Sequence, residues 1–398
     1  MVRAEAIGGA VSQTALDRRL QRYEKAPHLV FWETTKACAL SCRHCRASAQ
    51  TTGLPGELST AEGRRLIDQV AALGGSPILI LTGGDCLERP DLDELIVYAR
   101  QLGIHVGLSP SVTPRLTLER LAGLHQLGVR SLSISLDGSE PATHDGIRGI
   151  SGLFERTVAI LPQLVEMGFR VQVNTTVMSG NVLELADVVG LLRRLGISIW
   201  EVFFLVGVGR GIDLDEVGPA QAEDVCHFLV DVTARGMTVR TVEAPFFRRV
   251  QAERRELGSP PAPEHVGPLY AALRGRLDEL ALPPARPTAS HSLATGDGRG
   301  IVFVGHDGAV LASGFLPVPL GNIRQRDLGT IYAQSPLLAQ IRAGRFSGAC
   351  GRCEVSRLCG GSRARAYAHS GDVLGEDPAC ARSDSARALS DARGGLPD

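Results

Sequence analysis

Short apolar runs and longer amphipathic stretches alternate along the chain from about residue 29 to residue 235. Runs such as Ile78–Leu81 and Trp200–Leu205 are continuous and apolar, which is typical of parallel strands buried on both faces. These runs predict strands at 29–35, 77–82, 105–109, 131–136, 170–177 and 198–206. The amphipathic stretches predict helices at about 59–73, 91–102, 117–127, 152–167, 182–195 and 219–235. This alternation predicts an α/β fold in which a parallel sheet curls into a partial (β/α)6 TIM-like barrel, with ligands at the C-terminal strand ends.

The remainder of the chain predicts a second, smaller unit. A further strand is expected at about 239–243. The run 300–311 predicts a β-hairpin that turns at His306–Gly308, and a helix is expected from about residue 328 to 342. We therefore divide the chain into an N-terminal arm (1–28), the barrel (29–240), a connecting or lid segment (241–299) and a small C-terminal α+β domain (300–398).

Composition excludes several classes of protein. The 398 residues are 44% hydrophobic and 21% charged, which is ordinary for a globular protein. With 42 basic and 43 acidic residues the net charge is −1, so there is no electrostatic case for binding nucleic acid. The N-terminus lacks the apolar core of a signal peptide, and no apolar run approaches the roughly 20 residues of a membrane span. The sequence therefore predicts a cytoplasmic protein with no membrane or nucleic-acid partner.

Three cysteines follow the first predicted strand on one short loop, as Cys38, Cys42 and Cys45. Thiolates are soft metal ligands, and no secondary structure requires three of them so close together. Three thiolates leave one coordination position open on a tetrahedral zinc ion or a four-iron cluster. A disulfide between two of them would leave an odd thiol. A closed zinc site that borrows His44 is the remaining structural alternative.

A second set of cysteines lies near the C-terminus, at Cys350, Cys353, Cys359 and Cys380. Four thiolates suffice to close a [4Fe-4S] cluster completely. A zinc site with four thiolate ligands is the alternative, because the spacing of the cysteines does not distinguish the two.

The CxxxCxxC loop resembles the signature of the radical S-adenosylmethionine (SAM) superfamily, and the stretch from Cys350 to Cys380 resembles the SPASM/twitch extension of these enzymes. The resemblance covers residues 29–380. It implies that the first three cysteines hold a [4Fe-4S] cluster whose open iron binds SAM. Electron transfer from a flavodoxin- or ferredoxin-type reductant would then yield a 5′-deoxyadenosyl radical. The four C-terminal cysteines would hold an auxiliary cluster, and we predict only one, because Ser313 and Ser362 stand where further cysteines are expected.

The resemblance also implies which residues contact SAM. The loop Thr82–Cys86 resembles the GG(E/D)P motif, in which glycines allow close approach and a carboxylate receives the amino group. Ser135 and Arg148 match the residues that contact the methionyl carboxylate, and His44 takes the aromatic position near the adenine. The full expected set is His44, Gly83, Gly84, Asp85, Ser109, Ser135 and Arg148, together with Asn174 and Thr176 at the ribose and Leu205 and Val206 under the adenine. Asp137 is interpreted as a cap of the next turn.

Two cysteines fall outside both sets. Cys226 occupies an apolar position of a predicted helix and is expected in the core. Cys86 stands where the family usually has proline, at the C-terminal mouth of the barrel. We interpret it as a catalytic hydrogen-atom donor to a substrate radical, with a substitution tolerated in a turn as the alternative. Further candidates for substrate contact, which core or surface roles would also explain, are Glu243, Phe246, Phe247 and Tyr270.

These features predict a radical SAM enzyme of the oxidoreductase or epimerase type, active in natural-product biosynthesis. Its substrate is expected to be a small molecule such as a sugar, aminocyclitol or nucleoside moiety. A tetrapyrrole side chain is the second expectation, because haem-biosynthesis radical SAM proteins share the run GGSRARAYA. A ribosomal peptide is the third. The non-enzyme alternative is a zinc-binding scaffold, which predicts zinc, no iron and no SAM cleavage.

Overall fold

The computed structural model describes residues 18, 21–257, 261, 266–282 and 295–386. Seven parallel strands follow one another in chain order, each paired with the next. They are β1 (Leu29–Glu33), β2 (Ile78–Thr82), β3 (His105–Leu108), β4 (Ser131–Ser135), β5 (Arg170–Val177), β6 (Ile199–Phe204) and β7 (Thr238–Val242). The expected partial α/β barrel is confirmed, and β7 matches the further strand expected near 239–243.

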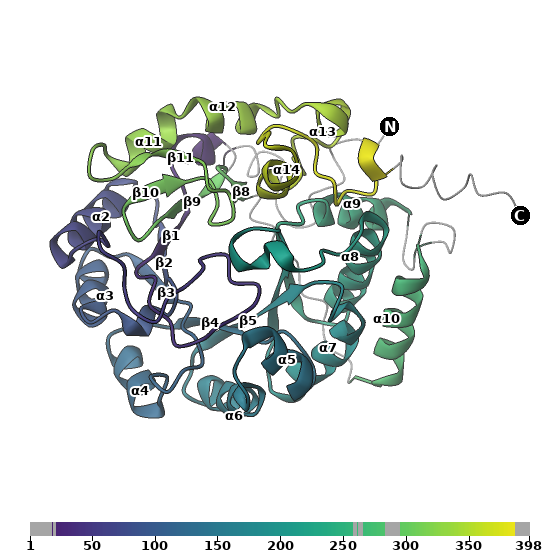
Figure 1. The fold of residues 1–398 in the computed structure, drawn as a ribbon, viewed down its shortest axis with the longest axis horizontal. Helices are drawn as coiled ribbons and strands as arrows, with labels where there is room; N and C mark the ends of the chain where they lie inside the picture. Colours follow the sequence, from purple (N-terminus) through teal and green to yellow (C-terminus); the bar gives the residue numbers. More distant parts are fainter. Residues whose placement is uncertain (1–17, 19–20, 258–260, 262–265, 283–294, 387–398) are drawn as a thin grey trace, which may run out of the picture.

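Helices cover the outside of these strands (Figure 1). The helices of this part of the chain are α2 (Thr60–Ala72), α3 (Leu92–Gln101), α4 (Leu118–Gln126), α5 (Pro141–Arg148), α6 (Leu153–Glu166), α7 (Leu185–Arg194), α8 (Pro219–Ala234), α9 (Phe247–Leu257) and α10 (Pro268–Glu279). Of these, α10 lies farthest out and packs against α7 and α8. Short 3₁₀ turns occur at Cys86–Glu88, Val182–Glu184 and Gly209–Asp213. The start of α2 is set locally by a capping box, in which Ser59 Oγ accepts from the Glu62 N–H and the Glu62 carboxylate accepts from the Ser59 N–H.

The C-terminal segment continues the barrel sheet. Strand β9 (Gly300–Val304) pairs in parallel with β1, so that Ile301 lies opposite Leu29. Strands β10 (Ala309–Leu311) and β11 (Pro319–Asn322) extend the sheet in antiparallel fashion, and the short β8 (Gly296–Asp297) pairs with β9. The predicted hairpin between β9 and β10 is confirmed. Its turn contains Gly308 at φ +82°, a conformation that favours glycine. The C-terminal ends of β1 and β9 therefore lie side by side.

The helix expected from about 328 to 342 is two helices, α11 (Leu328–Gln334) and α12 (Pro336–Ala343). Pro336 has no backbone N–H and cannot continue α11. Ser335 instead caps α12, since its hydroxyl accepts from the Leu338 N–H at 3.3 Å. Two further helices, α13 (Gly348–Arg352) and α14 (Arg363–Ser370), flank the second set of cysteines.

The two faces of the barrel strands differ in polarity. On β1, Val30 and Trp32 are fully buried, and the ring of Trp32 contacts α2 at Gly63. The opposite face points into the barrel and carries polar side chains on β4 to β6. There the Gln172 side chain donates to Glu201 Oε2 at 2.8 Å. Full TIM barrels fill this space with branched apolar side chains, so the polar lining marks the interior as the place for a ligand.

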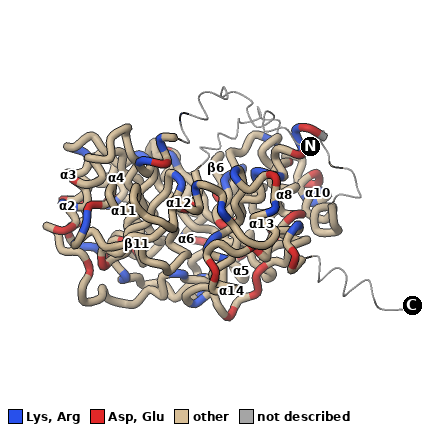
Figure 2. The backbone as a smooth tube through the Cα atoms, turned by 90° about the horizontal axis from the view of Figure 1, so that it is seen from above, with Lys and Arg blue, Asp and Glu red and all other residues tan. Residues whose placement is uncertain are grey.

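Charged residues of both signs are interspersed along the chain (Figure 2), in keeping with the balanced composition. Among the described residues, no helix is both long and apolar enough to span a membrane.

Candidate functional site

The first set of cysteines lies on a loop that follows β1 and is closed by hydrogen bonds. The Cys38 N–H donates to the Gln50 carbonyl at 2.7 Å, which joins the two ends of the loop. Arg210 reaches this loop from the far side of the barrel, where its Nε donates to the Cys42 carbonyl at 2.9 Å and its Nη1 to the Ala49 carbonyl at 3.1 Å. Sequence reasoning missed this role, because only the backbone of the run after β6 was considered.

Each sulfur of this loop has a nearby hydrogen-bond donor. Backbone N–H groups lie 3.4 Å from Sγ of Cys38 and 3.5 Å from Sγ of Cys45, and Nη1 of Arg148 lies 3.8 Å from Sγ of Cys42. Burial raises the pKa of Cys38 to about 11 and also raises the pKa of Cys42. These two thiols therefore ionise at neutral pH only beside a metal ion, whose charge offsets their burial. No three His, Cys, Asp or Glu side chains of the described ranges are preformed as a metal site. That these residues fit an iron–sulfur cluster is therefore argued from the three thiols and from the hydrogen-bond donors beside their sulfurs.

Asp137 is the hub of the polar contacts beside the cysteine loop. Its buried carboxylate accepts from Arg148 Nε at 2.6 Å and from the Thr176 N–H at 2.8 Å, and it lies 3.4 Å from His44 Nε2. Burial opposes ionisation of Asp137, but the charge of Arg148 together with His44, His144 and the Thr176 N–H outweighs it and lowers the pKa. Burial also lowers the pKa of His44 to about 4, so its imidazole is neutral at pH 7. Asp137 therefore holds Arg148 in place and does not merely cap a turn.

The Gly-Gly-Asp loop after β2 packs on the cysteine loop. A Cβ on Gly84 would lie 2.3 Å from the Ala37 carbonyl oxygen, so the glycine is needed for contact between two backbones. Asp85 is fully buried, and its carboxylate accepts from the Ser111 N–H at 3.3 Å and from Thr113 Oγ1 at 2.9 Å. Its expected contact with an amino group stays a prediction, since these oxygens already have donors within the protein.

The structure brings Ser135 and Arg148 together. Both line a cavity of about 10 Å³ that Leu40 of the cysteine loop and Ser111 also border. Ser109 follows β3, with its N–H bonded to the Leu81 carbonyl at 3.0 Å. The cavity is bounded by the cysteine loop, the end of β4 and α5. A ligand of the open iron would lie in this place.

The other predicted contacts of SAM lie on β5 and after β6. The Asn174 side chain accepts from Gln172 Nε2 at 2.9 Å, in register with Glu201 on β6. The Leu205 carbonyl accepts from Arg365 Nη2 at 3.0 Å, and the Val206 carbonyl accepts from a backbone N–H two residues on, at 2.7 Å. Both carbonyls thus have partners within the protein, and their contact with an adenine stays a prediction.

The second set of cysteines lies in the C-terminal segment, in and around α13 and α14. Cys353 lines a cavity of about 290 Å³ together with Arg352 and Arg382. Burial raises the pKa of Cys359 to about 12 and that of Cys380 to about 11. Each of these two sulfurs accepts from a backbone N–H, which favours the thiolate.

Cys350 has two donors of its own. The Asp377 N–H lies 3.4 Å from its sulfur, and Nη2 of Arg363 lies 3.7 Å away. Donors to the sulfurs are also a means by which proteins tune iron–sulfur clusters. The chemistry of this donor set, four thiols with hydrogen-bond donors to the sulfurs of Cys350, Cys359 and Cys380, fits a metal cluster.

Arg365 joins this segment to the barrel. Its guanidinium is 1% exposed, donates to carboxylate oxygens of Glu216 at 2.8 Å and Asp377 at 3.3 Å, and also donates to three backbone carbonyls. Those carbonyls belong to Phe204, Leu205 and Glu243, at the ends of β6 and β7. The sequence showed the arginine in the RARAY run, but its partners come from segments up to 161 residues away.

The two serines that replace expected cysteines share one acceptor. Ser313 donates to Oε1 of Glu243 at 3.0 Å, and Ser362 donates to Oε2 of the same carboxylate. Glu243 is buried and has φ +58°, an uncommon conformation for a residue with a side chain. Both serine hydroxyls are thus hydrogen-bonded to the Glu243 carboxylate. A contact of Glu243 with substrate stays a prediction.

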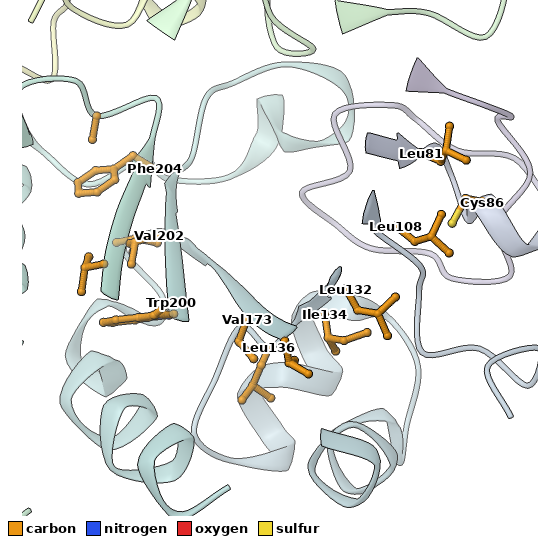
Figure 3. Packing of buried hydrophobic residues seen from close by; sticks show 14 of the residues in the cluster. Leu81, Cys86, Leu108, Leu132, Ile134, Leu136, Val173, Trp200, Val202 and Phe204 are labelled. Carbon is orange, nitrogen blue, oxygen red and sulfur yellow. The ribbon is translucent and has the colours of Figure 1, made fainter. Parts of the chain in front are cut away.

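The remaining candidates lie in the core. Cys86 is fully buried, and its sulfur packs among Leu81 and Leu108 (Figure 3). Because the thiol is enclosed in this way, the structure favours the interpretation of Cys86 as a tolerated substitution in a turn. It disfavours a role as a hydrogen-atom donor that meets substrate at the mouth of the barrel. Cys226 is fully buried in the apolar core, as predicted. The aromatic candidates also have core positions, namely Phe246, Phe247 and Tyr270.

Comparison with known proteins identifies relatives across nearly the whole chain. The model of the radical SAM superfamily matches residues 32–216. The AdoMet-dependent heme synthase of Methanosarcina barkeri is 36% identical over 357 residues, which is 89% of this chain and 96% of that protein. The mycofactocin maturase MftC of Mycobacterium ulcerans is 30% identical over 392 residues, which is 96% of this chain and 95% of that protein.

Among solved structures, Streptococcus suis SuiB bound to S-adenosylmethionine superposes with a TM-score of 0.63 at 15% sequence identity. The superposition covers 92% of this chain and 81% of SuiB. At this identity the likeness concerns the fold alone.

Proposed function

This chain belongs to the radical SAM superfamily, and from that membership we propose that it modifies the side chains of a tetrapyrrole. The observation that carries the proposal is the 36% identity with an AdoMet-dependent heme synthase over almost the full length of both proteins. A ribosomal peptide is the second candidate substrate, supported by the 30% identity with a mycofactocin maturase.

The expectation of a sugar, aminocyclitol or nucleoside substrate is wrong. Relatives that are 35% or 36% identical to this chain are named for the synthesis of haem, which favours the tetrapyrrole that was the second expectation. Epimerisation was expected as an outcome on a sugar-type substrate, so it is withdrawn together with that substrate. We propose an oxidative change of a tetrapyrrole side chain in its place.

The cofactors of this chain are a [4Fe-4S] cluster, SAM and an auxiliary cluster. We propose that Cys38, Cys42 and Cys45 hold the first cluster. When bound, the cluster and SAM supply a 5′-deoxyadenosyl radical that removes a hydrogen atom from the substrate. The proposed ligands of the auxiliary cluster are Cys350, Cys353, Cys359 and Cys380.

The residues around the first cluster have separate proposed tasks. Ser135 and Arg148 bind the carboxylate of SAM, because they line one small cavity beside the cysteine loop. Asp137 orients Arg148 through the 2.6 Å ion pair, and Arg210 keeps the loop closed. The neutral imidazole of His44 offers an apolar face to the adenine without adding charge beside the sulfonium.

The proposal is tested with protein purified and reconstituted without oxygen. SAM, dithionite and Fe-coproporphyrin III, a tetrapyrrole with carboxylate side chains, are added, and both 5′-deoxyadenosine and the mass of the tetrapyrrole are followed. We expect about eight irons per chain, if both sites hold four-iron clusters, and a change in tetrapyrrole mass that requires SAM. The matched control Cys38→Ala should release no 5′-deoxyadenosine. Release of 5′-deoxyadenosine with an unchanged tetrapyrrole would refute the proposed tetrapyrrole substrate. Protein that contains zinc but no iron would refute the proposed radical SAM activity.

A further inference from the structure

One carboxylate faces three basic side chains where β1 and β9 end. Glu33, the last residue of β1, is almost fully buried, and its Oε2 lies 3.3 Å from Lys36 Nζ and 3.2 Å from His306 Nδ1. Its Oε1 lies 3.3 Å from Arg46 Nη1. Burial alone would raise the pKa of Glu33, but the bond from His306 and the charges of Arg46 and Lys36 outweigh it and lower the pKa to about 2. The carboxylate is therefore ionised, and the basic groups outnumber it.

The contacts of Arg46 with other described residues involve only one of its three guanidinium nitrogens. Its Nη1 donates to Glu33 and to the Gly314 carbonyl, both at 3.3 Å. Within the described part of the chain, its Nε and Nη2 have no acceptor, and the side chain is 19% exposed. A guanidinium with free N–H groups in a half-buried place calls for an anion.

Aromatic rings gather around the same guanidinium. Its central carbon lies 4.5 Å from the ring centre of Phe303 on β9 and 5.8 Å from that of Phe315. Phe315 in turn lies 6.2 Å from Phe203 on β6, centre to centre. Phe203 and Phe315 are only half-buried although they border the barrel interior. Half-exposed rings beside a cation form a surface for a flat, aromatic and anionic ligand.

This surface is next to the site of chemistry. Arg46 directly follows Cys45, and β1 and β9, which carry Glu33 and Phe303, are neighbours in the sheet. Ser135 lies on β4, three strands along from β1. A ligand on this surface would therefore face the cysteine loop from the side of β1 and β9, with the proposed place of SAM at β4.

We propose that Arg46 binds a carboxylate of the substrate while Phe203 and Phe315 contact its planar ring and the buried Phe303 supports the guanidinium. The inference rests on the tetrapyrrole function proposed above and assigns residues to it. A tetrapyrrole has both features that the surface matches, a flat conjugated ring and carboxylates at its edge. A neutral sugar has neither.

The test is binding of coproporphyrin III, a metal-free tetrapyrrole with four carboxylates, followed by quenching of its fluorescence. We expect Arg46→Gln to raise the Kd about tenfold or more, the effect of a lost charge-assisted hydrogen bond. Arg64→Gln is the matched control, since Arg64 also lies over a ring, 4.9 Å from that of Tyr98, but on α2 outside the barrel. Its Kd should stay within about twofold of wild type. The methyl ester of the porphyrin, which lacks the charges, should bind wild type and Arg46→Gln alike.

The outcomes separate the two proposals. If wild-type protein does not bind coproporphyrin III, the tetrapyrrole function itself fails. If wild type binds but Arg46→Gln and Arg64→Gln have equal affinities, only the assignment of Arg46 and the rings fails. Should Arg46→Gln lose its fold or its iron, Phe315→Leu decides in its place: a Kd within twofold of wild type overturns the inference, and a rise of about tenfold supports it.

Discussion

Replacing Arg365 by lysine tests whether α14 holds the C-terminal segment on the barrel. The guanidinium is 1% exposed and makes five hydrogen bonds, two to the carboxylates of Glu216 and Asp377 and three to backbone carbonyls at the ends of β6 and β7. Its planar fork reaches acceptors in several directions at once. Lysine keeps the charge and offers three donors on a single nitrogen.

The expected loss of stability follows from this difference in donors. At least two of the five hydrogen bonds are lost, and a hydrogen bond to a charged group contributes about 1.5–3 kcal/mol. We therefore expect Arg365→Lys to lower the free energy of unfolding by about 3–6 kcal/mol. The carboxylate of Asp377, left in the protein interior with a poorer partner, adds to this loss.

The assay is unfolding in urea without oxygen, followed by circular dichroism and by the fluorescence of Trp32 and Trp200, both fully buried in the barrel. Coincident transitions by the two methods justify a two-state fit. Arg352→Lys is the control, because that side chain is 66% exposed and pairs with the surface residue Asp384. It should change the free energy by less than about 0.5 kcal/mol. A loss below about 1 kcal/mol for Arg365→Lys would show that the five contacts do not hold the segment.

Three further predictions concern the cofactors and the acid limit of stability. Asp137→Asn keeps an acceptor for the Thr176 N–H but removes the charge that holds Arg148, so calorimetry should show at least about tenfold weaker binding of SAM, and equal binding would contradict this role. The double substitution Cys353→Ala and Cys359→Ala keeps only two of the four C-terminal thiolates, so it should reduce iron from about eight to about four per chain, and unchanged iron would refute this ligand set. Glu33 has its pKa lowered from 4.5 to about 2, so its contribution of roughly 3 kcal/mol is complete above pH 4.5 and is lost as the pH falls toward 2. Glu33→Gln should lack this part of the acid dependence in urea unfolding between pH 4.5 and 2. An unchanged pH slope would refute the assignment.

The sequence alone determined the succession of strands and helices and both sets of cysteines. Apolar periodicity reports which face of each element is buried, so β1 to β7 could be located from local pattern. The cysteines could be found because metal ligands on one loop have short, recognisable spacing. Even so, the single helix expected from 328 to 342 was wrong, since Pro336 starts a new helix there.

The substrate class could not be decided from these patterns. The cysteine motifs concern the cofactors that all members of the superfamily use, whereas the substrate meets side chains spread over the whole barrel. The sugar-type expectation failed for this reason. Identity over nearly the full length of a heme synthase carried the information that the motifs lacked.

Only the tertiary structure decided which distant residues meet. Arg46 lies beside Phe303, Arg365 reaches the end of β6, and His306 contacts Glu33 across 273 residues of sequence. These contacts depend on the pairing of β9 with β1 and on the curvature of the sheet, and neither leaves a local pattern in the chain. The burial of Cys86 was also decided by the tertiary structure, since a position in a loop after a strand is exposed or enclosed according to how the neighbouring strands pack against it.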